Sequence, residues 1–329
     1  MKVFRLRNLA IGAALALGVS GAALAATTLV SAESQKSDHP VTQAQEFLAR
    51  TLAERSAGDL VMQVKSGGEL GSEPDVVDKL RKGDIAMGRV SMAILTETVP
   101  SVKLLSLPYL FRSREHMWSV LKGDFGKRLE SELDQTGLVV VTFYDSGTRS
   151  FYSVKKPIRT RSDFVGLRVR VQPSPVYKDL INQLGGTPVV MQYDKVLDGL
   201  KNNEIDAAEN NLPSYVSSEH YKYARYLSLD EHSMVPDVLL MSKKTWQKLT
   251  AQQQILLKQA AGQSSEYMTK LWAGKEREAL DVARKAGVTI LPKSQLAQTG
   301  IESFAVKLYT KYVQDDKDLE TVLKIVGAK

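Results

Sequence analysis

Two spacings of apolar residues follow one another along the first part of the chain. Short apolar or β-branched segments at 27–30, 60–64 and 85–87 are typical of buried strands. Between them, apolar residues recur at helical spacing over 40–58 and 74–80, which predicts two helices. Strand–helix–strand–helix–strand order predicts a parallel α/β sheet with helices on both faces.

The same order returns further along the chain. A strand is predicted at 164–171, a helix at 175–184 and another strand at 187–191. The segment 80–85 (LRKGDI) also matches 200–205 (LKNNEI) in register. This internal similarity predicts two related lobes. A helix-to-strand turn of the kind common in α/β folds is the alternative explanation.

Residues 245–282 differ from the rest because they contain no proline and carry apolar residues at helical spacing. One or two long helices are predicted here, with kinks at Gly262 and Gly274. A late strand at 288–291 and a closing helix at 301–313 follow. A long helix that belongs to neither sheet is placed to brace both lobes.

Composition narrows the chemistry. The chain has 329 residues, 43% apolar and 25% charged, which suits one large domain or two lobes. Cysteine is absent, which excludes disulfides, thiolate nucleophiles and Cys-based zinc sites, and the four His are scattered without metal-ligand spacing. Phosphate-binding, dinucleotide-binding and nucleophile-elbow motifs are also missing, so we expect no metal, no cofactor and no enzyme. An enzyme whose residues meet only on folding stays open.

Residues 1–25 have the organisation of a secretory signal peptide, with three basic residues, an apolar run and Ala23-Leu24-Ala25 as the cleavage site. An uncleaved membrane anchor is the alternative, because 9–26 is nearly long enough to span a bilayer. Cleavage removes three positive charges and lowers the formal net charge from +7 to +4. This modest, evenly spread charge argues against nucleic-acid binding. The mature protein is therefore predicted to be soluble and exported.

Polar residues in and after predicted strands are candidates for ligand binding, since ligands of open α/β sheets lie beyond the strand ends. In the strand ending Arg168-Val169-Arg170-Val171-Gln172, both arginines share one face. A guanidinium in an apolar strand needs an anion, and its parallel donors match a carboxylate. We expect Arg170, beside Gln172, to bind a ligand and Arg168 to be solvated. Structural salt bridges for both are the alternative.

Asn210 and Asn211 follow another strand, and their amides suit hydroxyl-rich ligands. For Asn211, a turn before Pro213 is an equally good explanation. Arg89 and Arg149 occupy similar strand-end positions. Together with Arg170, these arginines predict an anionic ligand that carries a carboxylate.

Several segments resemble the substrate-binding proteins of tripartite ATP-independent periplasmic (TRAP) transporters, of the DctP type. They are 70–73 (LGSE), 107–111 (LPYLF), 145–149 (DSGTR), 166–171 (GLRVRV) and 205–210 (IDAAEN). The resemblance covers essentially the whole mature chain. It implies a two-lobed α/β clamshell with a long bracing helix that closes on one organic acid in the periplasm and delivers it to membrane permease subunits.

The implied division assigns 1–25 to the signal peptide, 26–147 plus about 236–280 to lobe I, and 148–235 plus about 281–329 to lobe II. A monomer and a dimer that swaps the long helix are both compatible with it.

The resemblance also assigns roles to residues. Arg170 matches the arginine that forms a two-pronged salt bridge with the ligand carboxylate, Arg149 matches an assisting arginine, and Asn210 matches a further ligand contact. By position, Glu73, Tyr193 and His232 match additional pocket contacts.

Within the family, 171–172, 209–214 and 230–236 resemble the branch that binds hexuronates such as D-glucuronate and D-galacturonate. A hexuronate offers one carboxylate to Arg170 and several hydroxyls to the remaining polar candidates, which are Asn210, Asn211, Glu73, Arg89 and His39. The alternatives are a TRAP receptor for another organic acid (an aldonate, keto acid or dicarboxylate) and a secreted uronate lyase or epimerase.

Overall fold

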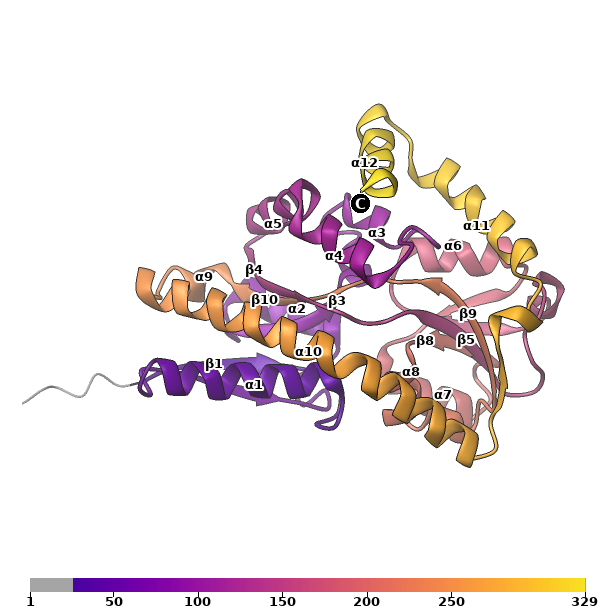
Figure 1. Ribbon diagram of the computed structural model, residues 1–329, viewed down its shortest axis with the longest axis horizontal. Coiled ribbons are helices and arrows are strands. Elements are labelled where there is room, and N and C mark those ends of the chain that lie inside the picture. The colour runs from indigo at the N-terminus through magenta and orange to yellow at the C-terminus, as the bar shows by residue number, and fades with distance from the viewer. Residues whose placement is uncertain (1–25, 329) are drawn as a thin grey trace, which may run out of the picture.

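The computed structural model describes residues 26–328, apart from the side chains of residues 298 and 299. The signal peptide predicted at 1–25 lies outside the described residues. Two lobes, each built around a sheet, lie side by side, and one long helix, α10 (Ala251–Lys285), runs along both of them (Figure 1). No helix in the described part of the chain is long and apolar enough to cross a membrane.

The first lobe contains a five-stranded sheet in the order β2-β1-β3-β10-β4. Its strands are β1 (Thr27–Ala32), β2 (Leu60–Lys65), β3 (Met87–Ser91), β4 (Leu138–Tyr144) and β10 (Asp237–Ser242). The first three are parallel, as predicted, but β10 is antiparallel to both of its neighbours. The predicted parallel arrangement is therefore confirmed for β1, β2 and β3 but does not extend to β10, which enters this sheet from the other lobe.

Helices cover both faces of this sheet. They are α1 (Pro40–Arg55), α2 (Glu73–Lys82), α3 (Val102–Leu105), α4 (Arg114–Lys122), α5 (Asp124–Gln135) and α9 (Lys243–Trp246). Alternate residues of β10 reach the two cores. Leu239 and Met241 pack with α1 and α10, whereas Val238 and Leu240 pack on the side of α2.

The second lobe contains a six-stranded sheet in the order β11-β9-β5-β8-β6-β7. Its strands are β5 (Arg149–Ser153), β6 (Arg168–Val171), β7 (Thr187–Val190), β8 (Ala207–Asn210), β9 (Tyr226–Ser233) and β11 (Thr289–Leu291). Its helices are α6 (Pro175–Leu184), α7 (Val196–Lys201) and α8 (Leu212–Ser217). The strand predicted at 164–171 is confirmed only from Arg168, because Arg161–Phe164 forms a short 3-10 helix.

The two lobes share one strand order over their first three parallel strands. β2-β1-β3 in the first lobe corresponds to β7-β6-β8 in the second. The sequence match between 80–85 and 200–205 falls at equivalent turns, where Gly83 and Asn203 both have positive φ, 84° and 56°. The prediction of two related lobes is therefore confirmed at the level of topology.

Apart from the crossing between the two C-terminal helices, three segments connect the lobes. Residues 145–148 join β4 to β5, residues 234–236 join β9 to β10, and α10 packs on α1 in the first lobe and on α8 in the second. The long helix continues without interruption through Gly262 and Gly274. Gly147, in the first connection, has a φ of 62°, and a Cβ there would lie 2.4 Å from Trp272 Nε1 of α10.

The C-terminal helices pack on different lobes. α11 (Gln298–Tyr312) packs on α6, whereas α12 (Asp316–Gly327) packs against the helices of the first lobe (Figure 1). His116 Nε2 of α4 lies 2.6 Å from the Ile325 carbonyl oxygen, and Lys103 pairs with Asp318 at 2.6 Å. The apolar pattern of the sequence does not predict α12. The division at 281–329 stays a prediction, and these contacts place its last segment with the first lobe.

Candidate ligand-binding site

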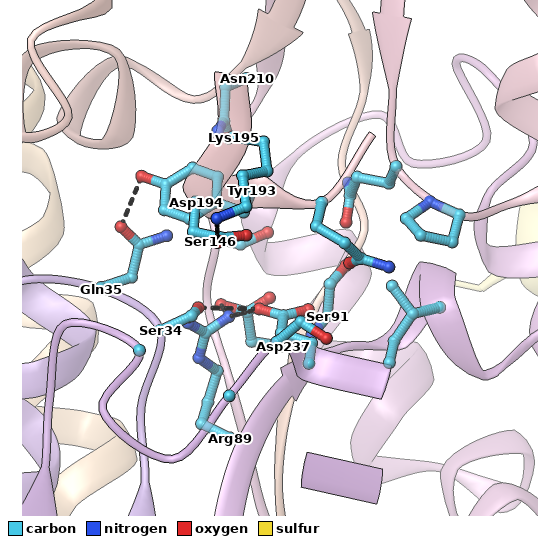
Figure 2. A pocket seen from close by; sticks show the side chains of 18 of the residues that line it. Ser34, Gln35, Arg89, Ser91, Ser146, Tyr193, Asp194, Lys195, Asn210 and Asp237 are labelled. Carbon is cyan, nitrogen blue, oxygen red and sulfur yellow. Dashed lines mark hydrogen bonds and ion pairs between the residues drawn. The ribbon is translucent and has the colours of Figure 1, made fainter. Parts of the chain in front are cut away.

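A polar cavity of about 420 Å³ lies between the two lobes. In Figure 2, Asn210, Tyr193, Asp194 and Lys195 of the second lobe face Ser34, Gln35, Arg89, Ser91 and Asp237 of the first. Eight of the ten predicted site residues line it: Glu73, Arg89, Arg149, Arg170, Gln172, Tyr193, Asn210 and Asn211. The topology brings them together because β3, β6 and β8 end at the cavity and β5 begins there. Their roles in binding stay predictions.

Arg170 reaches the cavity from β6 and is only 2% exposed. Its Nε donates to the Met191 carbonyl oxygen at 2.9 Å, while its Nη1 is buried without a hydrogen-bond partner in the described part of the chain. Burial lowers its pKa below the ordinary arginine value. Since no ion pair with a described residue compensates this burial, Arg170 presents an unpaired cationic donor to the cavity. Arg168, by contrast, is half-exposed and pairs with Asp206 at 2.8 Å.

Arg149 reaches the same cavity from β5 and is already paired with Glu209 of β8. Its Nη2 donates to Glu209 Oε1 at 3.0 Å, and its Nη1 donates to Asn210 Oδ1 at 2.9 Å. Burial raises the pKa of Glu209, but Arg149 and His232 outweigh burial and lower it to about 2. The pair is therefore ionised at neutral pH and contributes little net charge.

Gln172 lines the cavity and contacts residues of both lobes. In the amide orientation that suits both neighbours, its nitrogen donates to Ser91 Oγ at 3.0 Å and its oxygen accepts from Arg149 Nη2 at 3.2 Å. Ser91 ends β3 of the first lobe, whereas Gln172 follows β6 of the second. This contact belongs to an arrangement in which the lobes are closed on each other.

Asn210 and Asn211 have different local roles. Asn210 Oδ1 accepts from Arg149 and also from the Asn211 backbone N–H at 2.9 Å, which leaves its amide nitrogen for a ligand. Asn211 is the N-cap of α8, and its Oδ1 accepts from the Ser214 N–H at 2.8 Å. The alternative of a turn-forming role is therefore confirmed for Asn211, although its side chain also lines the cavity.

Arg89 is surrounded by carboxylates. Its Nε donates to Glu33 Oε2 at 3.0 Å, and its Nη1 lies 2.7 Å from Glu73 Oε1 and 3.4 Å from Asp237 Oδ2. Burial would lower its pKa, but Glu33, Asp237 and Glu73 raise it well above the ordinary value. Arg89 is thus permanently charged and neutralised by protein groups, in contrast to Arg170.

Tyr193 lines the cavity and contacts the first lobe. Its hydroxyl, at the start of the segment that leads into α7, donates to Gln35 Oε1 of the first lobe at 2.7 Å (Figure 2). Burial raises its pKa above the ordinary value, so the phenol stays protonated and able to donate. Gln35 also donates from Nε2 to Ser214 Oγ at 3.3 Å. The Tyr193–Gln35 contact is a second bridge between the lobes.

His39 does not line the cavity, so the prediction that it contacts the ligand is wrong. Its Nδ1 accepts from the Val41 N–H at 3.3 Å at the start of α1, and its Nε2 lies 3.1 Å from Ser214 Oγ. Burial, aided by Arg89, lowers its pKa well below the ordinary value. A neutral ring that caps a helix leaves no nitrogen free for a ligand.

His232 also lies behind the wall. Its ring stacks on Phe151 with 4.2 Å between centroids, and its Nδ1 lies 2.9 Å from Asp230 Oδ2. Burial would lower its pKa, but Asp230 and Glu209 raise it to about 9, so the ring is protonated at neutral pH. His232 therefore supports the carboxylate that holds Arg149 and has no direct access to the cavity.

Several residues that line the cavity were not predicted from the sequence. They are Ser34, Gln35, Ser91, Ser146, Asp194, Lys195 and Asp237. Most follow a strand or lie in a connection between the lobes, so the rule that selected Arg89 applied to them as well. Their residue types are common in ordinary turns, and nothing in the sequence separates the two uses. Within residues 26–328, no group of three His, Asp or Glu side chains is arranged to hold a metal ion.

Two sheets of related topology, joined by several chain segments, with a polar cavity between them define a two-lobed solute-binding protein. Residues 31–315 match the family model described as "Bacterial extracellular solute-binding protein, family 7", the DctP family. The chain belongs to this family of transporter receptors, which are binding proteins and not enzymes.

Known proteins agree with this membership. The chain is 31% identical over 285 residues to a solute-binding protein of Chromohalobacter salexigens, covering 87% of this chain and 84% of the relative. A TRAP periplasmic solute-binding protein of Bradyrhizobium, solved with D-galacturonate, is 36% identical with a TM-score of 0.88, covering 91% of this chain and 99% of its own. Another from Pseudomonas putida F1, solved with D-glucuronate, is 30% identical with a TM-score of 0.87, covering 92% and 98%.

Proposed function

We propose that this protein is the periplasmic receptor of a TRAP transporter, that it captures a hexuronate, D-glucuronate or D-galacturonate, and that it delivers this sugar acid to membrane permease subunits. The predicted signal peptide would export it. Family membership and the bound sugar acids of its structural relatives support the proposal.

The observation that carries the proposal is the guanidinium of Arg170, which lines the polar cavity between the lobes without a carboxylate partner in the described part of the chain. A ligand carboxylate would accept from the buried Nη1 and compensate the cost of burying the charge. Arg149 and Gln172 lie beside it and hold the geometry of this end of the cavity. A hexuronate has one carboxylate, which is enough to pair with the Arg170 guanidinium.

The opposite end of the cavity suits hydroxyl groups. Glu73 and Asp237 offer carboxylate oxygens there, and Asn210, beside Arg149 on the second lobe, offers an amide nitrogen. Sugar hydroxyls both donate and accept, so they can pair with each of these groups. A small ligand without hydroxyls would leave them unpaired at about 1–3 kcal/mol each.

Ligand binding should favour the closed arrangement of the lobes. The bridges Tyr193–Gln35 and Gln172–Ser91 form only when both lobes approach the cavity. A ligand held by Arg170 on one side and by Glu73 on the other would add contacts that exist only in that state. The permease would then recognise the closed, loaded receptor.

A thermal-shift panel on the mature protein, unfolded and refolded to remove carried-over ligand, tests the proposal. At about 100 times its Kd, a ligand stabilises by about 2.7 kcal/mol, which is several degrees in Tm. We expect a shift with glucuronate or galacturonate and none with succinate or sialate. A shift with an unrelated acid alone would keep the receptor and exclude the hexuronate. Chemical conversion of recovered uronate would instead indicate a lyase or epimerase.

A further inference from the structure

The first-lobe end of the cavity carries more acidic than basic groups. Three carboxylates, from Glu33, Glu73 and Asp237, surround the single guanidinium of Arg89. With all four groups ionised, this cluster has a formal charge of −2. Glu33 and Glu73 are held further by hydrogen bonds, the first from the Gln35 N–H at 2.8 Å and the second from the Ser91 N–H at 3.0 Å.

Asp237 is the least engaged member of this cluster. It makes the longest of the three ion pairs, 3.4 Å to Arg89 Nη1, and it lines the cavity at the first residue of β10. Its backbone is fixed, because it pairs with Ser91 of β3 and Tyr144 of β4. A rigid, buried carboxylate with little compensation therefore faces the ligand.

The second-lobe end has the opposite balance. Arg149 is neutralised by Glu209, and protonated His232 lies against Asp230 behind them. Arg170 adds one unpaired positive charge. A ligand bound between the lobes thus lies between an end that attracts a carboxylate and an end that repels one.

We propose that Asp237 is a specificity-determining residue that excludes ligands with a carboxylate at both ends. The proposal rests on the proposed function and narrows its substrate class to sugar acids with one carboxylate and a hydroxyl at the far end. A hydroxyl donates to Asp237, whereas a second carboxylate would meet it as a like charge in a site of low dielectric. Aldarates and C4-dicarboxylates are excluded by this mechanism.

The charged groups around Asp237 determine when it is ionised. Burial raises its pKa to about 7, opposed by Arg89 and assisted by Glu73 and Glu33, with Arg149 facing it across the cavity. Tyr177 of α6 also lies within electrostatic range and stays protonated, since burial raises its pKa. Exclusion should therefore strengthen as the pH rises through neutrality.

The test compares two open-chain acids, D-galactonate with one carboxylate and galactarate with two, by isothermal titration calorimetry on the ligand-free mature protein. Because both acids are open chains, a difference in their affinities does not come from the difference between a sugar ring and an open chain. We expect the wild type to bind galactarate at least about tenfold more weakly than galactonate. Asp237→Asn should narrow this ratio at least about tenfold by strengthening galactarate binding. Asp78→Asn is the control, because it removes an exposed carboxylate on α2, and it should leave the ratio of the two affinities unchanged.

A second readout needs no variant. Both carboxyl groups of galactarate stay ionised between about pH 6 and pH 8, so any change in the wild-type ratio over this range reports protein groups. We expect the ratio to widen toward pH 8. An unchanged ratio in both Asp237→Asn and the pH series would overturn the inference, as would galactarate binding the wild type as tightly as galactonate. If the wild type bound neither glucuronate nor galacturonate, the proposed function itself would fail instead.

Discussion

Arg149 and Arg170 reach the same cavity from the strands on either side of β8, but of these two arginines only Arg149 makes an ion pair with a carboxylate of the described residues. Glu209, on the strand between them, makes its ion pair with Arg149. The guanidiniums of Arg149 and Arg170 therefore have different roles. Arg149 organises the wall together with Asn210 and Gln172, while Arg170 keeps a donor for an incoming anion.

Arg170→Ala should weaken hexuronate binding by about 2–5 kcal/mol, because the ligand carboxylate would be buried without its partner. Arg168→Ala is the matched control, since it removes the same side chain from the same strand but faces solvent and Asp206. Calorimetric titration of both variants measures the difference. Near-native affinity in Arg170→Ala would remove the salt bridge from the mechanism.

Asn210→Ala and Asn211→Ala should differ in their effect on binding. Loss of the Asn210 amide should weaken binding about tenfold, as expected for one hydrogen bond, and should also lower the free energy of unfolding, because its Oδ1 accepts from Arg149 and from the Asn211 N–H. Loss of the Asn211 cap of α8 should lower that free energy by about 1 kcal/mol. Titration and urea denaturation of both variants test the contrast. Equal affinities for Asn210→Ala and the wild type would contradict it.

Gly147→Ala should be far more destabilising than Gly137→Ala. Both glycines have positive φ, 62° and 85°, so each substitution strains the backbone by about 1–2 kcal/mol. A Cβ at residue 147 would also lie 2.4 Å from Trp272 Nε1, whereas one at residue 137 meets nothing within 4 Å. Urea denaturation should show an additional loss of about 1–3 kcal/mol for Gly147→Ala. Equal losses of unfolding free energy in the two variants would mean that residues 145–148 can move away from α10 without cost.

His232 should make the protein less stable in alkali. Its folded pKa of about 9 lies above the ordinary 6.5, so the folded state binds this proton more tightly than the unfolded state. The resulting stabilisation, on the order of 3 kcal/mol, is complete below about pH 6.5 and is lost as the pH rises through about 9. Denaturation of the wild type and His232→Gln across this range measures it. Parallel pH profiles would contradict the assignment.

Local patterns in the sequence were enough to predict the strands and helices that repeat in the two lobes, and the alternation around Arg170 was enough to select it. Helix α6 (Pro175–Leu184) and the turn at Gly83 depend on interactions between residues close in sequence, and these do not change with the tertiary fold. Arg170 was identifiable because a charged residue in an apolar strand has few stable explanations.

Other features depend on residues that are distant in sequence. The neutralisation of Arg89 needs Glu33 and Asp237, which are 56 and 148 positions away. The same is true of His39, whose partner Ser214 comes from the other lobe. Sequence spacing does not predict such long-range contacts. The sequence therefore identified these residues as candidates but could not distinguish a ligand contact from a structural contact.

The packing of α12 on the first lobe has a practical consequence for biosensor design. β1 and α12, the first and last described elements, belong to the same lobe, so fluorescent proteins fused at both ends would move together and would not report closure. A single dye on Val165→Cys, which is 64% exposed on the second lobe, would have no competing thiol in this cysteine-free chain. Paired with one terminal fusion, it would convert ligand-driven closure into a change in energy transfer.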